Sequence, residues 1–209
     1  DVCSSDLERI SEILQYYIAL RMSTDPAWKK LVVIYSSHRC PGEGEHKIID
    51  YLRESIVNGT YDREDRTLCY GSDADLILLA MTLHQTNVSI IRKDDYFDSP
   101  WEQSHLLDNY YIIDIPVLVE ILKCELTEGV DSWIDSQNTD RVIDDFVFFM
   151  SFCGNDFLHQ IPFFSISRNA LRVLIDAYIV VLNESHSFIV TNMVPDMEMT
   201  KRMLQVMSE

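Results

Sequence analysis

Apolar and polar positions alternate along this chain in two patterns, one with the period of a helix and one typical of short strands. Helical spacing predicts helices over residues 7–18, 48–56 and 75–83, while short apolar runs predict strands over 31–36, 67–70, 88–92 and 110–113. The run 31–36 (LVVIYS) is apolar on both faces, as expected of a parallel strand covered by helices on each side. This alternation indicates an α/β fold with a mostly parallel central sheet flanked by helices.

From Pro116 onward the pattern becomes helical. Apolar stripes predict helices over 117–126, 142–152 and 169–182, with Pro116 well suited to a helix start. Residues 61–66 (YDREDR) are expected to form a charged connector, and 131–140 (DSWIDSQNTD) an acidic loop. We therefore expect one α/β unit with a helix-rich C-terminal third, rather than two separable domains.

Composition places the chain in a broad class. Its 209 residues, 47% of them hydrophobic, can bury a core as one domain. No apolar run reaches the length that spans a membrane, so we expect no membrane partner. The five cysteines are odd in number and form no CxxC pair, which argues against both a disulfide partner and a zinc site. An intracellular location, in cytoplasm or nucleus, follows as an expectation.

The start of the chain has its own features. There is no initiating Met, and residues 1–7 (DVCSSDL) resemble translated sequencing adapter. We therefore expect the natural part of the domain to cover residues 8–209 and its N-terminal part to be missing.

The net charge of −17 argues against an extensive nucleic-acid surface within this chain, because phosphate binding normally depends on clusters of Lys and Arg. Two explanations remain open. Metal ions could make an acidic pocket attractive to phosphate, with the basic surface in a part of the protein not present here. Alternatively, the protein binds no nucleic acid and its acidity is solvated surface. Charge alone favours the second explanation, so the motifs must decide.

The first acidic motif is PGEGEHK, where Pro41 and Gly42 predict a turn before the next helix. Glu43 and Glu45 flank a glycine at that helix start and could both reach a ligand. The alternative is that both acids simply favour the positive end of the helix dipole. His46 and Lys47 are candidate phosphate contacts, although a solvent-facing Lys47 would fit the pattern equally well.

The second motif, GSDADLILLA, places two aspartates at the end of a predicted strand. Ala74 keeps the turn small, so that Asp73 and Asp75 can reach one ion or two neighbouring ions. The alternative is that one aspartate caps the following helix and the other is exposed. Capping leaves the second aspartate without a role.

The third motif, FCGNDFL, brings Asp156 after an apolar helix. Phe157 and Leu158 are expected to return at once to the core, where an aspartate is costly unless it is paired, hydrogen-bonded or bound to metal. A capping role for Asn155 or Asp156 is the alternative.

Five carboxylates that converged at one sheet edge would repel one another strongly unless divalent cations lay among them. An all-oxygen ligand set suits Mg²⁺ or Mn²⁺, whereas Zn²⁺ would normally recruit His or Cys. The motifs therefore indicate a metal-dependent site for cleaving phosphodiester bonds.

Taken in order, PGEGEHKI, GSDADLILL and FCGNDFL with a following IP resemble segments of the Xrn 5′→3′ exoribonucleases, within the flap-endonuclease-like (PIN-like) nuclease superfamily. The similarity extends from about residue 25 to the C-terminal helices. It implies a PIN-like fold and a site with one or two divalent cations, for which we expect two Mg²⁺ or Mn²⁺ ions. The metal-ligand positions of the family fall on Glu43, Glu45, Asp73, Asp75 and Asp156. The implied substrate is RNA with a 5′-monophosphate, contacted by His46, Lys47 and Asn155.

The chain departs from the family pattern in a few places. His159 stands where the family usually has Pro, and Ser72 replaces a commoner apolar residue. Family members also have an N-terminal segment with two further metal-binding aspartates and a basic helix that grips the 5′-monophosphate, and this chain contains neither. We expect that segment of the same protein to be a required partner, and the isolated chain to be weakly active or inactive.

Three functions are consistent with these features. The first, favoured by the resemblance, is two-metal hydrolysis of RNA from its 5′ end during decay or processing, with the ions about 3.5–4 Å apart. The second is a flap-type DNA nuclease, although those enzymes carry a different acidic pattern. The third is a non-catalytic module with a nuclease fold, which the presence of all five candidate ligands disfavours.

Overall fold

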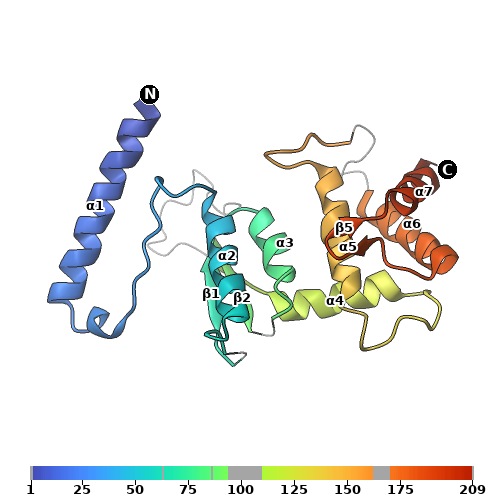
Figure 1. Ribbon diagram of the computed structural model, residues 1–209, viewed down its shortest axis with the longest axis horizontal. Coiled ribbons are helices and arrows are strands. Elements are labelled where there is room, and N and C mark those ends of the chain that lie inside the picture. The colour runs from blue at the N-terminus through green and yellow to red at the C-terminus, as the bar shows by residue number, and fades with distance from the viewer. Residues whose placement is uncertain (1, 63, 86, 94–109, 162–169, 209) are drawn as a thin grey trace, which may run out of the picture. The chain divides into compact units, whose positions relative to one another are not determined.

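The computed structural model describes residues 2–62, 64–85, 87–93, 110–161 and 170–208, and these form a helix-rich α/β chain, as the sequence predicts (Figure 1). Contacts within the chain divide it into two compact units, Asp1–Ile48 and Ile49–Glu209. Among the described residues, no helix combines the length and apolar character needed to cross a bilayer.

The first unit is built on a long helix, α1 (Val2–Thr24), followed by the short turn η1 (Trp28–Lys30). The Tyr17 and Trp28 rings meet edge to face with their centroids 6.1 Å apart. The Arg21 guanidinium lies over the Trp28 ring, 5.7 Å from its centroid. These contacts fold η1 back onto the end of α1. The predicted first helix is confirmed, and it is longer than its apolar stripe.

The segment 31–36 was predicted to be a buried parallel strand, and that prediction is wrong for this chain. The segment is extended but pairs with no strand of the described residues. The Tyr35 hydroxyl donates to Ser11 Oγ of α1 at 3.1 Å, so one face lies against the helix. On the other face Val32 and Ile34 are 91% and 62% exposed. The apolar pattern predicts the extended backbone correctly, but burial also needs a second covering layer.

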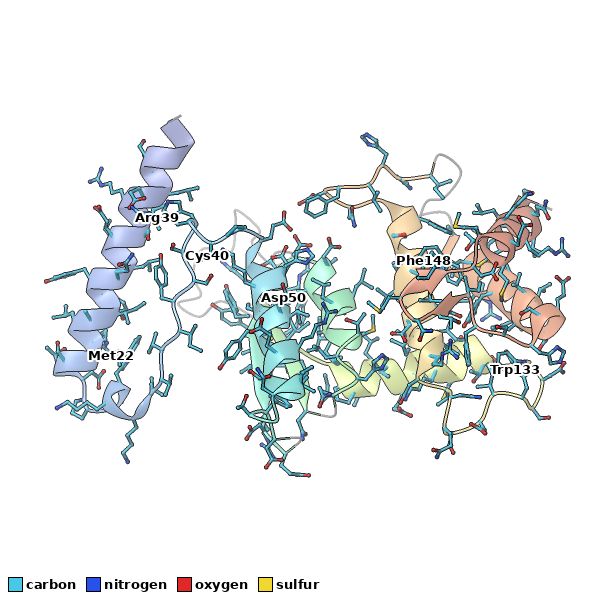
Figure 2. All side chains as sticks on the ribbon, in the orientation of Figure 1. Met22, Arg39, Cys40, Asp50, Trp133 and Phe148 are labelled. Atoms are coloured by element: carbon cyan, nitrogen blue, oxygen red, sulfur yellow. The ribbon has the colours of Figure 1, made fainter. Side chains whose placement is uncertain are left out.

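Ion pairs fix the end of this segment to α1. Arg39, labelled in Figure 2, donates from its Nε to Glu8 Oε2 at 3.1 Å. His38 Nε2 lies 3.1 Å from the same oxygen. The hydrogen bond from Arg39 lowers the pKa of the Glu8 carboxyl below its ordinary value. Polar contacts of Tyr35, His38 and Arg39 therefore hold the C-terminal side of the extended segment on α1.

A small sheet lies in the second unit, in the order β1 (Thr67–Tyr70), β2 (Val88–Lys93) and β3 (Tyr110–Asp114). β1 and β2 are parallel, with Cys69 opposite Ile90, and α3 (Asp75–Met81) lies in the connection between them. β2 and β3 are antiparallel, with Ile90 opposite Ile113. The sheet is mixed, which corrects the expectation of a mostly parallel one. The apolar pattern of a strand predicts its burial and leaves its direction open.

The two faces of this sheet differ. Cys69, Val88 and Ile90 are buried on one face, where α4 (Ile115–Thr127) packs against β2 and β3. On the other face Leu68 and Ile112 are 59% and 70% exposed. Helix α2 (Gly44–Val57), which begins in the first unit, contributes two buried side chains, Ile49 and Leu52, to the core.

The remainder of the second unit is helical. It contains α5 (Arg141–Met150), η2 (Ser151–Cys153), α6 (Ala170–Ser185), the short hairpin β4 (Val190–Thr191) with β5 (Val194–Pro195), and α7 (Met197–Ser208). The predicted helices over 117–126, 142–152 and 169–182 correspond to α4, to α5 with η2, and to α6. The hairpin and α7 were not predicted. Helix α4 packs on α5 and α6, and α6 packs on α7.

One buried carboxylate links three parts of this helical region. Asp145 of α5 is 0% exposed, and its Oδ2 accepts from the Tyr178 hydroxyl at 2.7 Å and from the Ile189 N–H at 2.9 Å. Its Oδ1 accepts from the Val190 N–H at 2.6 Å. Burial raises the pKa of Asp145, while these hydrogen bonds oppose the rise. The contacts join α5 to α6 and to the backbone that leads into β4.

Candidate catalytic centre

A cluster of metal-ligand atoms lies at the start of α2. One donor atom each from Glu43, Glu45 and His46 can be chosen so that all three lie within 4.8 Å of one another. His46 Nε2 is 3.7 Å from Glu43 Oε2, and both side chains are 42% exposed. The two carboxylates of the first motif therefore come together, and His46, which we expected to contact the substrate, lies directly beside them.

The local sequence accounts for this cluster. The Lys47 N–H donates to the Glu43 carbonyl at 3.1 Å, so Glu43 lies where α2 begins and Glu45 lies in its first turn. Acids at that position also favour the positive end of the helix dipole, so the simpler alternative describes the same geometry. Lys47 does not face solvent freely, because its Nζ donates to the Ser37 carbonyl at 3.0 Å.

The second motif follows β1, as predicted. Asp73 Oδ1 accepts from the Asp75 N–H at 3.1 Å, which gives Asp73 a capping contact at the start of α3. Asp73 is exposed and Asp75 is half-buried. A Cβ added to Gly71 would lie 2.7 Å from Leu76 Cδ2, so glycine permits the close approach of the strand end to α3. The capping alternative therefore holds for Asp73, whose Oδ2 makes no described hydrogen bond.

The third motif forms a tight turn after η2. Asn155 Oδ1 accepts from the N–H groups of Phe157 and Leu158 at 3.0 and 2.8 Å, and the Asn155 N–H donates to the Leu158 carbonyl at 2.9 Å. Gly154 has φ 82°, and a Cβ there would lie 2.7 Å from the Gln160 nitrogen. Only glycine fits this position. Asn155 is thus the residue that shapes the turn.

The expectation that Phe157 and Leu158 return to the core is wrong. They are 67% and 53% exposed, because the Asn155 turn directs the chain away from the packed helices. Asp156 is exposed as well, so the cost of burying an aspartate gives no support for its role. Its assignment as a ligand rests on the motif alone.

The five candidate ligands are divided between the two units. Glu43 and Glu45 lie in the first, and Asp73, Asp75 and Asp156 lie in the second. As a donor set, Glu43, Glu45 and His46 fit a divalent cation, because two carboxylates and an imidazole can turn toward a common point. The convergence of all five carboxylates on shared ions stays a prediction.

The contact between His84 and Asp144 in the second unit was not predicted from the sequence. His84 Nε2 lies 3.0 Å from Asp144 Oδ1, although the residues are 60 positions apart. The hydrogen bond to Asp144 raises the pKa of the imidazole above its ordinary value. A histidine after a helix and an aspartate in the first turn of another are common separately, so neither gives a sequence signal.

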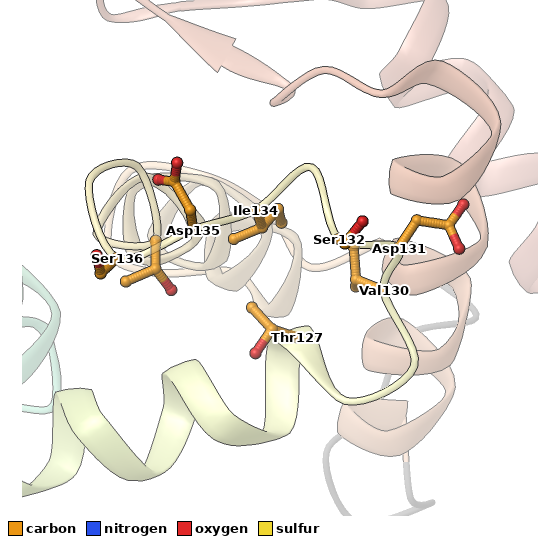
Figure 3. A pocket seen from close by; sticks show the side chains of 8 residues that line it. Thr127, Val130, Asp131, Ser132, Ile134, Asp135 and Ser136 are labelled. Carbon is orange, nitrogen blue, oxygen red and sulfur yellow. The ribbon is translucent and has the colours of Figure 1, made fainter.

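Two hollows in the second unit contain none of the five candidate ligands. One, of about 430 Å³, is lined by Arg66, Thr67, Leu68, Asn87, Val88, Ser89, Ile112, Asp114 and Pro116. The other, of about 270 Å³, is lined by Thr127, Val130, Asp131, Ser132, Ile134, Asp135, Ser136 and Thr139 (Figure 3). Figure 3 shows the Asp131 and Asp135 carboxylates pointing in different directions, so they do not form a common cation site.

Comparison with known proteins gives a consistent result. Residues 3–94 match the family model described as the XRN 5′-3′ exonuclease N-terminus, and residues 136–209 match the Xrn1 helical domain. The 5′-3′ exoribonuclease 1 of Schizosaccharomyces pombe is 32% identical over 188 residues, covering 88% of this chain and 14% of the relative. The 5′-3′ exoribonuclease 2 of Saccharomyces cerevisiae is 31% identical over 219 residues, covering 95% of this chain and 22% of the relative.

A human relative, 5′-3′ exoribonuclease 1, is 29% identical over 186 residues, covering 88% of this chain and 11% of the relative. The chain thus spans less than a quarter of the length of these relatives. The two matching segments contain all five candidate carboxylates, with four in residues 3–94 and Asp156 in residues 136–209.

Proposed function

This chain belongs to the XRN 5′-3′ exonuclease family, and from that premise we propose that it forms part of a metal-dependent 5′→3′ exoribonuclease with a PIN-like fold. The substrate we propose is RNA with a 5′-monophosphate, hydrolysed one phosphodiester bond after another during decay or processing. The observation that carries the proposal is the cluster of Glu43, Glu45 and His46 donor atoms within 4.8 Å at the start of α2.

Glu43, Glu45, Asp73, Asp75 and Asp156 are the proposed ligands of two Mg²⁺ or Mn²⁺ ions. Bound there, the ions would supply a hydroxide at neutral pH and stabilise the departing oxyanion. Asp73 already uses Oδ1 to accept from the Asp75 N–H, which orients its carboxylate and leaves Oδ2 for a ligand. The Asn155 turn holds the backbone on either side of Asp156 in one conformation.

The proposed substrate contacts are His46, Lys47 and Asn155. The Lys47 ammonium has three N–H donors and spends one on the Ser37 carbonyl, so it can be held in place and still donate to a phosphate oxygen. The Asn155 side-chain oxygen is occupied by two backbone N–H groups, which leaves only its NH₂ group for a substrate. We propose that the basic surface that the net charge of −17 lacks comes from the remainder of the protein.

The test uses the full-length protein that contains this chain, with RNA carrying either a 5′-monophosphate or a 5′-hydroxyl and with matched single-stranded and flap DNA. We expect Mg²⁺-dependent loss of the 5′-monophosphate RNA, prevented by chelator and reduced at least 100-fold by Glu45→Gln. The matched control is Asp50→Asn, an exposed acid of the same helix, α2, which should leave the rate unchanged.

Cleavage that survives both chelator and Glu45→Gln would contradict the ligand assignment. Preferential cleavage of the flap DNA would instead favour the DNA nuclease. RNA binding without cleavage at any metal concentration would favour a non-catalytic module.

A further inference from the structure

The His84–Asp144 contact joins two helices, α3 and α5, whose far ends lie at or near proposed ligands. His84 lies just beyond the C-terminal end of α3 (Asp75–Met81), and Asp144 lies in the first turn of α5 (Arg141–Met150). Their Nε2 and Oδ1 atoms are 3.0 Å apart, and both side chains are 35% exposed. The pair therefore connects the end of one helix to the beginning of the other.

Proposed ligands lie at or beyond the opposite ends of the same helices. Asp75 is the first residue of α3, and α5 leads through η2 to the turn that contains Asp156. Helix α3 packs against α5, and the two run in opposite directions in Figure 1. Fixing the His84 end therefore fixes how far α3 can slide along α5, and with it the spacing between the start of α3 and the loop after α5.

The surroundings of His84 favour its charged form. The hydrogen bond that the imidazole donates to Asp144 raises its pKa most, and the charges of Asp144 and Asp140 add to this. Partial burial and the Lys123 ammonium lower the same pKa. Lys123 of α4 is itself paired with Glu120 at 2.7 Å and with Asp140. A cation just after the end of α3 also complements the negative end of the helix dipole.

A neighbouring contact holds the same corner independently of pH. Arg53 of α2 donates to the Thr82 hydroxyl at 2.9 Å, two residues before His84. The His84 backbone has φ 50°, and its N–H donates to the Met81 carbonyl at 3.3 Å. The backbone at the end of α3 thus positions the imidazole. Of the contacts at this helix end, the one between His84 and Asp144 depends on pH.

We propose that His84 and Asp144 are positioning residues, which set the alignment of α3 with α5 and thereby the spacing of Asp73 and Asp75 from Asp156. This inference rests on the proposed function for its consequence, because the residues it positions are the proposed ligands. Its structural part, the coupling between the two ends of each helix, is independent of any metal. The alignment is tightest when His84 is protonated and relaxes as it loses its proton.

The sign follows from linkage. A histidine whose pKa is raised in the folded state contributes stability that is fully present below its unfolded pKa of about 6.5 and is lost as pH rises through the folded value. The stability contributed by His84 is therefore lost at a pH above the ordinary pKa of histidine, about 6.5.

The test is a pH titration of the ¹⁵N-labelled chain by NMR, without metal. We expect the amide resonances of Asp75 and Asp156 to shift with the same midpoint as the His84 imidazole. Asp144→Asn should lower the His84 midpoint, and the Asp75 and Asp156 amides should no longer show a shift with the His84 midpoint (the shared step). Asp144→Glu should restore the shared step. His186→Asn removes another partly exposed histidine, 3.7 Å from Asp131, and should leave the shared step unchanged.

Amides of Asp75 and Asp156 that do not follow the His84 midpoint would overturn the proposal, as would a shared step that persists in Asp144→Asn. If Asp144→Asn fails to fold, His84→Asn provides the same comparison, because it removes the other partner of the same contact. A parallel Mn²⁺ titration separates the two claims. Coupled amides in a full-length protein that binds no Mn²⁺ would contradict the proposed function and leave the positioning role intact.

Discussion

The Tyr178 hydroxyl of α6 donates a 2.7 Å hydrogen bond to Oδ2 of Asp145 in α5, and both side chains are completely buried. The carboxylate has no lysine or arginine hydrogen-bonded to it among the described residues. One hydroxyl and two backbone N–H groups donate to it, and the nearby charge of Arg141 also favours its ionised form. Burial raises the pKa of the Tyr178 hydroxyl well above its ordinary value, so the phenol remains a donor at any physiological pH. This contact therefore fixes α5, whose C-terminal end leads to Asp156.

Tyr178→Phe should destabilise the chain by about 1–3 kcal/mol, because one of the three donors to a buried carboxylate is lost. Urea unfolding followed by circular dichroism measures the change. Tyr16→Phe, at a position 70% exposed, is the matched control and should change the free energy of unfolding by less than about 0.5 kcal/mol. Equal effects of the two substitutions would show that the buried hydrogen bond contributes nothing.

Asp73 has a capping contact and a proposed metal role, and two substitutions separate them. Asp73→Asn keeps an oxygen that can accept from the Asp75 N–H, so its stability should match the wild type, whereas Asp73→Ala should lose about 1 kcal/mol. Both should abolish metal-dependent RNA cleavage by the full-length protein. Thermal unfolding and a cleavage assay provide the two readouts. Full activity in Asp73→Asn would show that Asp73 caps α3 and is not needed as a metal ligand.

At Gly154 both a positive φ and a close backbone neighbour require glycine, whereas at Gly129 only the positive φ does. Both have positive φ, 82° and 86°, but only at Gly154 would a Cβ meet backbone, the Gln160 nitrogen at 2.7 Å. Gly129→Ala should cost about 1 kcal/mol from backbone strain, and Gly154→Ala clearly more. Chemical denaturation measures both. A Gly154→Ala variant as stable as Gly129→Ala would show that the backbone near Gln160 can shift to accommodate a Cβ at little cost.

Much of the fold follows from local patterns in the sequence. The short apolar run at Thr67–Tyr70 predicts β1, and the turn sequence GSDAD after it predicts the start of α3 almost to the residue. Both predictions succeed because the end of a strand, a turn and the start of a helix depend on neighbouring side chains. The three helices α4, α5 and α6 are predicted for the same reason. The hairpin β4–β5 has strands of two residues each, too short for any periodicity to be visible.

The rest depends on distant parts of the chain. An apolar run such as 31–36 predicts an extended backbone, but whether Val32 is buried depends on which layers surround it. Phe157 was expected in the core for its apolar side chain, and the side-chain hydrogen bonds of Asn155 decide otherwise. The pairing of His84 with Asp144 spans 60 positions and has no local signature.

The central claim is that carboxylates from three separate motifs bind shared divalent cations. The most direct measurement is an anomalous difference map from crystals of the full-length protein grown with Mn²⁺. We predict Mn²⁺ peaks at about 2.0–2.4 Å from carboxylate oxygens that include both Glu45 and the Asp73–Asp75 pair, with Asp156 within reach of the same ions. Peaks confined to one motif, or carboxylates of the three motifs too far apart for any common ion, would contradict the claim.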